Sequence, residues 1–246
     1  TEEALALDET VAASALLPYE EVRDFFHYKN NYLHVLDMAA EALAERCGIA
    51  ACAPAEQALE RYLHETRGVR VERVSGGDLM RRFDPAERLL TLNTAQPAET
   101  RTFQMACQIV AADLGTLIED ELSQAGLRSP SGAEICRISL TNYAAGALLL
   151  PYESFRRAAQ ALRHDLDQLA LAFQTSFEQV CHRLSTLQRP GARGIPFYFV
   201  RVDMAGNITK RHSATRFQFA RFGGTCPLWN VHDAFAQDGR TLVQVA

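Results

Sequence analysis

The stretch TRTFQMACQIVAADLG, residues 100–115, is the centre of the fold that the sequence predicts. Its apolar residues recur at steps of three and four, a spacing that places them on one face of an α-helix. The stripe consists of Phe103, Ala106, Val110, Leu114 and Leu117 and reaches Glu121. The spacing therefore predicts one long helix, roughly from Glu99 to Ala125, with one buried face.

The segments around this helix predict strands before it and helices after it. LMRRFDPAERLLTLN, residues 79–93, predicts two strands joined by a turn at Asp84-Pro85, because proline at the second turn position presets φ. Alternation and helical spacing predict the other elements. These are a helix over 54–68, a strand over 69–75, a helix over 133–150 stopped by Pro151, and two short helices over 165–187.

The two ends of the chain differ in character from this centre. Residues 19–47 predict one helix, or two helices with a break at Asn30-Asn31. At Arg189 a Pro/Gly-rich joint begins, and residues 197–214 predict a β-hairpin around an Ala-Gly-Asn turn. A further strand and a Gly-Gly turn should precede Trp229. We therefore expect an α+β protein with three parts: a helical segment over 1–53, a mainly helical domain with a small sheet over 54–187, and a smaller β-rich domain over 188–246.

Charge is unevenly distributed along the chain. The formal net charge is −5, but residues 1–187 carry 17 basic and 27 acidic residues, and residues 188–246 carry 8 basic and 3 acidic ones. An acidic body argues against wrapping nucleic acid. The basic, aromatic-rich end suits a phosphorylated ligand or an anionic partner, although its arginines could equally do no more than solvate a sheet.

Cysteine usage and hydropathy indicate a cytoplasmic protein. No Cys-x-x-C pair occurs, and the scattered cysteines are typical of free thiols in a reducing compartment. No run of 18 apolar residues is present, and the first residues are acidic where an export signal would be basic, so we expect no membrane span and no leader. The cysteines are Cys47, Cys52, Cys107, Cys136, Cys181 and Cys226.

The order of elements over roughly 54–187 resembles the IrrE/ImmA-type zinc metallopeptidase domain. The best-matching pieces are LLTLN at 89–93, TRTFQMACQIVAADLG at 100–115 and TNYAAGALLLPYESF at 141–155. In those peptidases the long helix carries His-Glu-x-x-His. Two histidines four residues apart face one metal, and the glutamate between them polarises the bound water. The next helix supplies a glutamate as the third ligand.

In this chain the resemblance puts other residues at the metal-binding positions. The first histidine position is Cys107, the glutamate position is Gln108, and the second histidine position is Ala111. The third ligand position falls on Leu140. Since a methyl group and an isobutyl group bind no metal and an amide is no base near neutral pH, we expect a pseudo-peptidase without zinc and without peptidase activity.

Nearly the whole chain resembles the short-chain fatty acyl-CoA-responsive transcription regulators (the ScfR group, with RamB-, PccR- and MccR-like members). The matching pieces are YEEVRDFF at 19–26, LDMAAEALAE at 36–45, the joint at 189–196 and ARFGGTCPLWNVH at 220–232. Members of that group begin with a DNA-binding helix-turn-helix domain, which we do not expect within these 246 residues. The resemblance implies an effector-binding portion that senses propionyl- or acetyl-CoA, forms a homodimer and reaches DNA only through another domain.

Two groups of residues are candidates for such a ligand, with no resident cofactor or metal expected. A cavity in place of the metal site would hold the short acyl chain. Arginines and aromatic rings nearer the C-terminus would meet the phosphates and the adenine of CoA. The candidate ligand-binding residues are Phe103, Cys107, Gln108, Tyr143, Arg193, Phe197, Arg221, Phe222, Cys226 and Trp229.

Several alternatives stay open at this point. The acyl pocket could lie wholly in the C-terminal part, whose pattern resembles PAS/GAF-like sensor folds. Cys107 could be the nucleophile of a thiol-dependent hydrolase or thioesterase, or the chain could be a protein-interaction scaffold. Cys226 and His232 could also join a metal site with further ligands. For the dimer, the amphipathic segment 19–47 is the expected interface.

Overall fold

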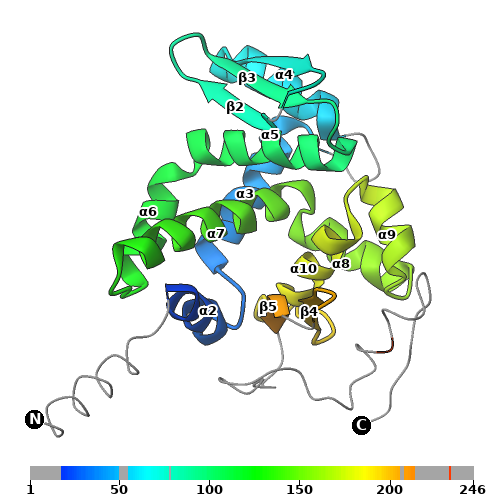
Figure 1. The fold of residues 1–246 in the computed structure, drawn as a ribbon. Coiled ribbons are helices and arrows are strands. Elements are labelled where there is room, and N and C mark those ends of the chain that lie inside the picture. Colours follow the sequence, from blue (N-terminus) through cyan, green and yellow to red (C-terminus); the bar gives the residue numbers. More distant parts are fainter. Residues whose placement is uncertain (1–17, 50–54, 78, 206–207, 214–232, 234–246) are drawn as a thin grey trace, which may run out of the picture.

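The computed structural model describes residues 18–49, 55–77, 79–205, 208–213 and 233 (Figure 1). Within these ranges the fold is mainly helical with two small sheets, as the sequence predicts. The helices are α2 (Pro18–Tyr28), α3 (His34–Cys47), α4 (Ala55–Arg67), α5 (Ala98–Asp113), α6 (Gly115–Gln124), α7 (Pro130–Leu149), α8 (Tyr152–Ala161), α9 (Leu166–Phe173) and α10 (Phe177–Ser185). The strands are β1 (Arg70–Val74), β2 (Arg81–Asp84), β3 (Leu89–Asn93), β4 (Tyr198–Val202) and β5 (Ile208–Ser213).

The predicted break in the N-terminal helical segment is confirmed. Asn30 and Asn31 have φ values of 52° and 54°. Asparagine tolerates this left-handed conformation better than most residues because its short polar side chain bonds locally. The two residues therefore end α2 and let α3 start in a new direction.

The three-stranded sheet has the order β1-β3-β2, with β1 parallel to β3 and β2 antiparallel to it. The predicted turn between β2 and β3 is confirmed, and the Asp84 carboxylate accepts hydrogen bonds from the backbone N–H groups of Ala86 and Glu87 at 3.0 and 3.2 Å. Leu90 and Leu92 of β3 are fully buried. Because side chains alternate along a strand, these two leucines lie on the same face of the sheet, and both belong to the core.

The single long helix predicted over 99–125 is wrong in one respect, since it is divided into α5 and α6. Leu114 has φ −116° and ψ 9°, outside the helical region, and α6 begins at Gly115. Asp113, the last residue of α5, accepts a hydrogen bond from the Tyr62 hydroxyl at 2.9 Å and pairs with Arg67. These contacts with α4 hold the end of α5, and the chain turns there.

Two other boundaries differ from the prediction. The helix expected over 133–150 begins at Pro130, because the Ser129 hydroxyl caps it by accepting a bond from the Gly132 N–H at 3.0 Å. The helix α8 was not predicted at all. Pro151 ends α7 and at the same time occupies the N-cap position of α8, where the absence of an N–H is tolerated.

The core is built around α7. Every residue from Tyr143 to Leu150 is buried, and a helix that is apolar on all sides lies inside a protein. It contacts α2, α3, α5, α6 and α10, and Figure 1 shows it crossing the middle of the molecule beneath α5. No helix among the described residues is long and apolar enough to cross a membrane.

The predicted hairpin after the joint is confirmed as β4 and β5, which pair antiparallel with an irregularity between Arg201 and Val202. It packs against α10. The further strand and the Gly-Gly turn near Trp229 lie outside the described residues. A PAS- or GAF-like fold of this part therefore stays a prediction.

Candidate functional site

One candidate site lies on α5, at the residues that the resemblance to the peptidases singled out. Phe103 and Cys107 are one helical turn apart and both are partly buried, while Gln108 is 8 % exposed. Residues four apart face the same side of a helix. The structure thus places Phe103 and Cys107 on one face of α5, and Gln108 follows Cys107 on the same helix, turned about 100° from it.

Arg81 of β2 joins this site and was not predicted. One of its terminal guanidinium nitrogens donates a hydrogen bond to Gln108 Oε1 at 2.6 Å. The alternation along β2 contains a signal for it, because Arg81 shares a strand face with Phe83, which packs on the core. A charge-assisted bond of this length fixes the orientation of the Gln108 amide.

Asn142 of α7 faces Cys107 from the opposite side. The Cys107 thiol donates to Asn142 Oδ1, with 3.7 Å between sulfur and oxygen. Burial raises the pKa of the Cys107 thiol to about 12, although the Arg81 charge acts in the other direction. The group is therefore a neutral thiol near neutral pH, and a neutral thiol is a poor nucleophile.

Slow alkylation of Cys107 is the first expected result. A thiol with a pKa of about 12 holds roughly a thousandfold less thiolate at pH 7 than one at its usual value near 8.5–9. Peptide mapping after iodoacetamide treatment should therefore show Cys107 reacting at least about a hundredfold more slowly in the folded protein than in the urea-unfolded chain. Equal rates would show that a thiolate is available and would revive the hydrolase alternative.

The residues at this site do not fit a zinc ion. Among the residues that the structure describes, no group of three or more His, Cys, Asp or Glu side chains is close enough to hold a metal. Ala111 is exposed on α5, and Leu140 is fully buried in the core. The positive charge of Arg81 beside Gln108 also opposes a divalent cation.

Tyr143 belongs to a different part of the molecule. Its hydroxyl donates to Asp37 Oδ2 at 2.9 Å and accepts from the Leu33 N–H at 3.1 Å, so it faces α3. Burial raises its pKa well above the usual value. The structure therefore does not bring Tyr143 to the α5 site with Cys107.

The remaining predicted residues lie after α10. Arg193 is exposed on the joint, and the Phe197 ring lies 5.9 Å from the His164 ring between centroids. The residues Arg221, Phe222, Cys226, Trp229 and His232 lie outside the described residues. Their part in a ligand or metal site stays a prediction.

A cluster of buried charges that the sequence did not reveal surrounds Asp37. Asp37 is 0 % exposed and Arg183 is 2 % exposed. Arg183 donates to Asp37 at 2.6 and 3.3 Å, and Arg189 donates to it at 3.2 Å. We call this the Asp37 cluster; it comprises Tyr32, Asp37, Glu41, Tyr143, Tyr152, Arg183 and Arg189.

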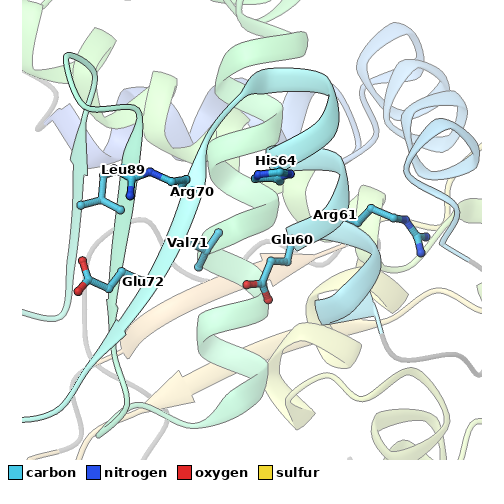
Figure 2. A pocket seen from close by; sticks show the side chains of 7 residues that line it. All are labelled: Glu60, Arg61, His64, Arg70, Val71, Glu72 and Leu89. Atoms are coloured by element: carbon cyan, nitrogen blue, oxygen red, sulfur yellow. The ribbon is translucent and has the colours of Figure 1, made fainter.

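A surface groove of about 610 Å³ lies between α4 and β1. Figure 2 shows Glu60 and His64 on the helix side and Val71 on the strand side, while Arg61 points away from the sheet. Glu60 already pairs with Arg73 at 2.7 Å, and charges of both signs line the rest. Such walls do not suit an acyl chain, and none of the predicted ligand-binding residues lines the groove.

The helical domain with its mixed sheet and its packed α5–α7 pair has the architecture of a metallopeptidase-like domain of the IrrE type. Residues 65–185 match the family model of the IrrE N-terminal-like domain. Residues 186–246 match the model described as short-chain fatty acyl coenzyme A regulator, C-terminal. The chain belongs to the short-chain fatty acyl coenzyme A regulator family.

Curated relatives and a solved structure agree with this assignment. A propionyl-CoA carboxylase regulator of Cereibacter sphaeroides is 49 % identical over 252 residues, covering 100 % of this chain and 51 % of the relative. The HTH-type transcriptional regulator PrpR of Mycobacterium tuberculosis is 47 % identical, covering 94 % of this chain and 48 % of the relative. The chain thus spans about half the length of these relatives.

The RamB regulator of the same organism is 43 % identical and covers 95 % of this chain and 49 % of its own length. A solved Mycobacterium tuberculosis transcriptional regulator superposes with a TM-score of 0.88 at 46 % identity. That match covers 94 % of this chain and 70 % of the solved chain. By name, PrpR, RamB and the solved protein are transcriptional regulators, and the Cereibacter sphaeroides relative is a regulator of propionyl-CoA carboxylase.

Proposed function

We propose that this chain is the effector-binding portion of a transcription regulator of acyl-CoA metabolism, with propionyl- or acetyl-CoA as the ligand. The observation that carries the proposal is the match of residues 186–246 to the acyl coenzyme A regulator model. The relative named propionyl-CoA carboxylase regulator supports it. In this proposal DNA is contacted outside these 246 residues.

The α5 site has the chemistry to hold a short acyl thioester. Arg81 occupies the Gln108 oxygen, and this leaves the amide nitrogen of Gln108 to donate to the thioester carbonyl. Phe103 and the neutral Cys107 thiol offer an apolar surface on the same helix. Arg81 itself carries exposed positive charge beside the site.

The CoA moiety of the ligand needs basic side chains for its phosphates and aromatic side chains for its adenine. The segment after residue 187 supplies an excess of basic residues, and Arg193 is exposed on its first loop. Arg221 with Phe222 or Trp229 would complete the contacts to phosphates and adenine. Phe197 and Cys226 belong to the same proposed set, whereas Tyr143 would act only through the Asp37 cluster.

The hydrolase alternative has less support. A catalytic cysteine needs a base or a positive field that stabilises its thiolate. The Cys107 thiol instead has a pKa of about 12 because it is buried. If the chain is instead a protein-interaction scaffold, no metabolite should shift its melting temperature.

Calorimetry and thermal melting with propionyl-CoA and acetyl-CoA test the proposal. A ligand at a hundred times its Kd stabilises the folded state by about 2.7 kcal/mol, which corresponds to roughly 5–10 °C in Tm for a chain of this size. Free CoA should bind more weakly than the acyl thioesters. If the α5 site holds the acyl group, Gln108→Leu should weaken binding roughly fivefold, since one hydrogen bond contributes about 1 kcal/mol.

Gln124→Leu is the matched control for that variant. Gln124 lies exposed at the end of α6, so the same change of side chain there should leave the affinity unaltered. If millimolar acyl-CoA produces no heat and no shift in Tm, the proposed function is refuted. Normal binding by the Gln108→Leu protein would move the acyl pocket into the C-terminal part.

A homodimer through the N-terminal helices is part of the proposal. Exposed large apolar side chains on α2 and α3 support it, namely Tyr19, Tyr28, Val35 and Met38. Regulators of two-fold DNA sites are usually two-fold dimers. Sedimentation equilibrium would decide between a monomer and a dimer.

A further inference from the structure

Two arginines share the buried carboxylate of Asp37, and they differ in how firmly they are held. Arg183 of α10 is 2 % exposed. Its Nε donates to the Leu150 carbonyl at 2.8 Å, and its terminal nitrogens donate to Asp37 and to Thr186. Arg183 and Asp37 therefore form a neutral, fully enclosed pair within the helical domain.

Arg189 approaches the same carboxylate from the joint that leads into the C-terminal part. Its guanidinium donates to the Tyr32 hydroxyl at 3.0 Å, to Asp37 at 3.2 Å and to Glu41 at 2.7 Å. It lies 4.0 Å from the centroid of the Tyr152 ring. One side chain thus connects the joint to the start and the middle of α3.

The backbone of the joint is fixed at the same place. The Arg189 N–H donates to the Tyr152 hydroxyl at 2.8 Å, and that hydroxyl donates to the Ala192 carbonyl at 3.0 Å. The Gly194 N–H closes the loop on the Leu187 carbonyl at 2.8 Å. Residues 187–194 are therefore a compact loop that rests on Tyr152 and is tied to α3 by Arg189.

The contact between Arg189 and Asp37 can break without leaving the Asp37 carboxylate unpaired. Without it, Asp37 keeps Arg183 as its partner, so no fully buried charge would be left alone. Glu41 has a side chain that is 19 % exposed, and it also accepts the Glu153 N–H at 3.0 Å. Removal of Arg183, by contrast, would leave Asp37 enclosed with only the partly exposed Arg189.

We propose that Arg189 is a detachable latch that links the position of the C-terminal part to α3. The two states differ in whether the guanidinium sits between Tyr32, Asp37 and Glu41 or has moved away with the joint. Ligand binding after residue 187 and the packing of the N-terminal helix pair are then thermodynamically coupled, and the coupling is reciprocal. The coupling to ligand binding rests on the proposed function, whereas the contact between Arg189 and α3 can be tested in the ligand-free protein without it.

Amide hydrogen exchange of Arg189→Gln, read by mass spectrometry, tests the latch. In the ligand-free protein the change should raise exchange at least about tenfold in residues 187–194 and in α3 together, because both lose a shared contact. Arg128→Gln is the matched control, since Arg128 is exposed in the loop before α7. It should leave both segments unchanged. If Arg189→Gln leaves them unchanged as well, the latch is refuted.

The second part of the test repeats the hydrogen-exchange measurement with saturating propionyl-CoA. In the wild type it should change the exchange of α3, and in Arg189→Gln it should still bind, by heat release, without changing α3. An equal α3 response in both proteins would overturn the latch. If the wild type releases no heat, the proposed function fails, and the ligand-free comparison alone decides on the latch.

Tyr152→Phe provides a second variant in case Arg189→Gln does not fold. It removes the hydroxyl that bonds Arg189 and Ala192 and keeps all charges. We expect faster exchange in residues 187–194 with a smaller effect on α3. Faster exchange of α3 with an unchanged loop would contradict the proposal.

Discussion

Replacement of Asp37 by alanine is expected to lower the free energy of unfolding by about 3–5 kcal/mol, the range seen when one partner of a buried ion pair is removed. Asp37 is fully enclosed and accepts bonds from Arg183, Arg189 and Tyr143. Without its carboxylate the Arg183 charge stays buried with no anionic partner that it bonds. Urea unfolding followed by circular dichroism measures the change as a lower midpoint.

The double variant Asp37→Leu with Arg183→Met is the control for that result. It removes both charges and keeps apolar bulk, so it should be more stable than Asp37→Ala alone. This holds although the Leu150 carbonyl loses the Arg183 donor. A loss below about 1 kcal/mol for Asp37→Ala would mean that water reaches the cluster, and the enclosed pair described above would not exist.

Leu140→Glu is expected to be still more damaging, by about 4 kcal/mol or more, because it buries a carboxylate without a partner. Leu140 is 0 % exposed and belongs to the core around α7. The same change two residues earlier, Ile138→Glu, falls on a side chain that is 60 % exposed. It should alter stability by no more than about 0.5 kcal/mol.

The pair of variants also tests whether a glutamate at position 140 can create a zinc site. Added zinc should not restore the stability of Leu140→Glu, since Ala111 supplies no ligand to complete a site. Thermal melting with and without zinc measures this directly. Equal stability of the two glutamate variants would contradict the burial of Leu140, and zinc-dependent recovery would contradict the interpretation of the site as metal-free.

Local patterns in the sequence predicted most elements correctly, and their failures have physical causes. The break at Leu114 was missed because the apolar stripe runs through it from Val110 to Leu117 without interruption. The chain turns there because α4 holds Asp113, a contact that helical periodicity cannot reveal. The helix α8 was missed because Pro151 was taken only as a stop, although proline is as acceptable before a helix as after one.

The candidate site could be predicted only where one motif contains it. Cys107 and Gln108 were found because the peptidase motif marks their positions on one helix. Arg81 and Asn142 come from other elements, at 27 and 35 residues' distance along the chain. Tyr143 was predicted to line the α5 site, but its hydroxyl bonds Asp37 of α3, whereas the preceding residue, Asn142, accepts a bond from Cys107. Adjacent residues on a helix point about 100° apart.

The Asp37 cluster was beyond prediction for the same reason. The bonds to Asp37 join residues separated by 106 to 152 positions, as between Asp37 and Tyr143 or Asp37 and Arg189. Nothing in the local pattern of α3 distinguishes an aspartate that will be enclosed from one that will face water. Only the packing of α3 against α7 and α10 makes that distinction.

The burial of α7 from Tyr143 to Leu150 restricts how the molecule can respond to its surroundings. A rod that is wedged among five neighbours cannot slide or rotate without displacing all of them at once. We therefore expect a rearrangement of the molecule to involve the contact between α3 and the 187–194 loop, while the buried part of α7 keeps its place.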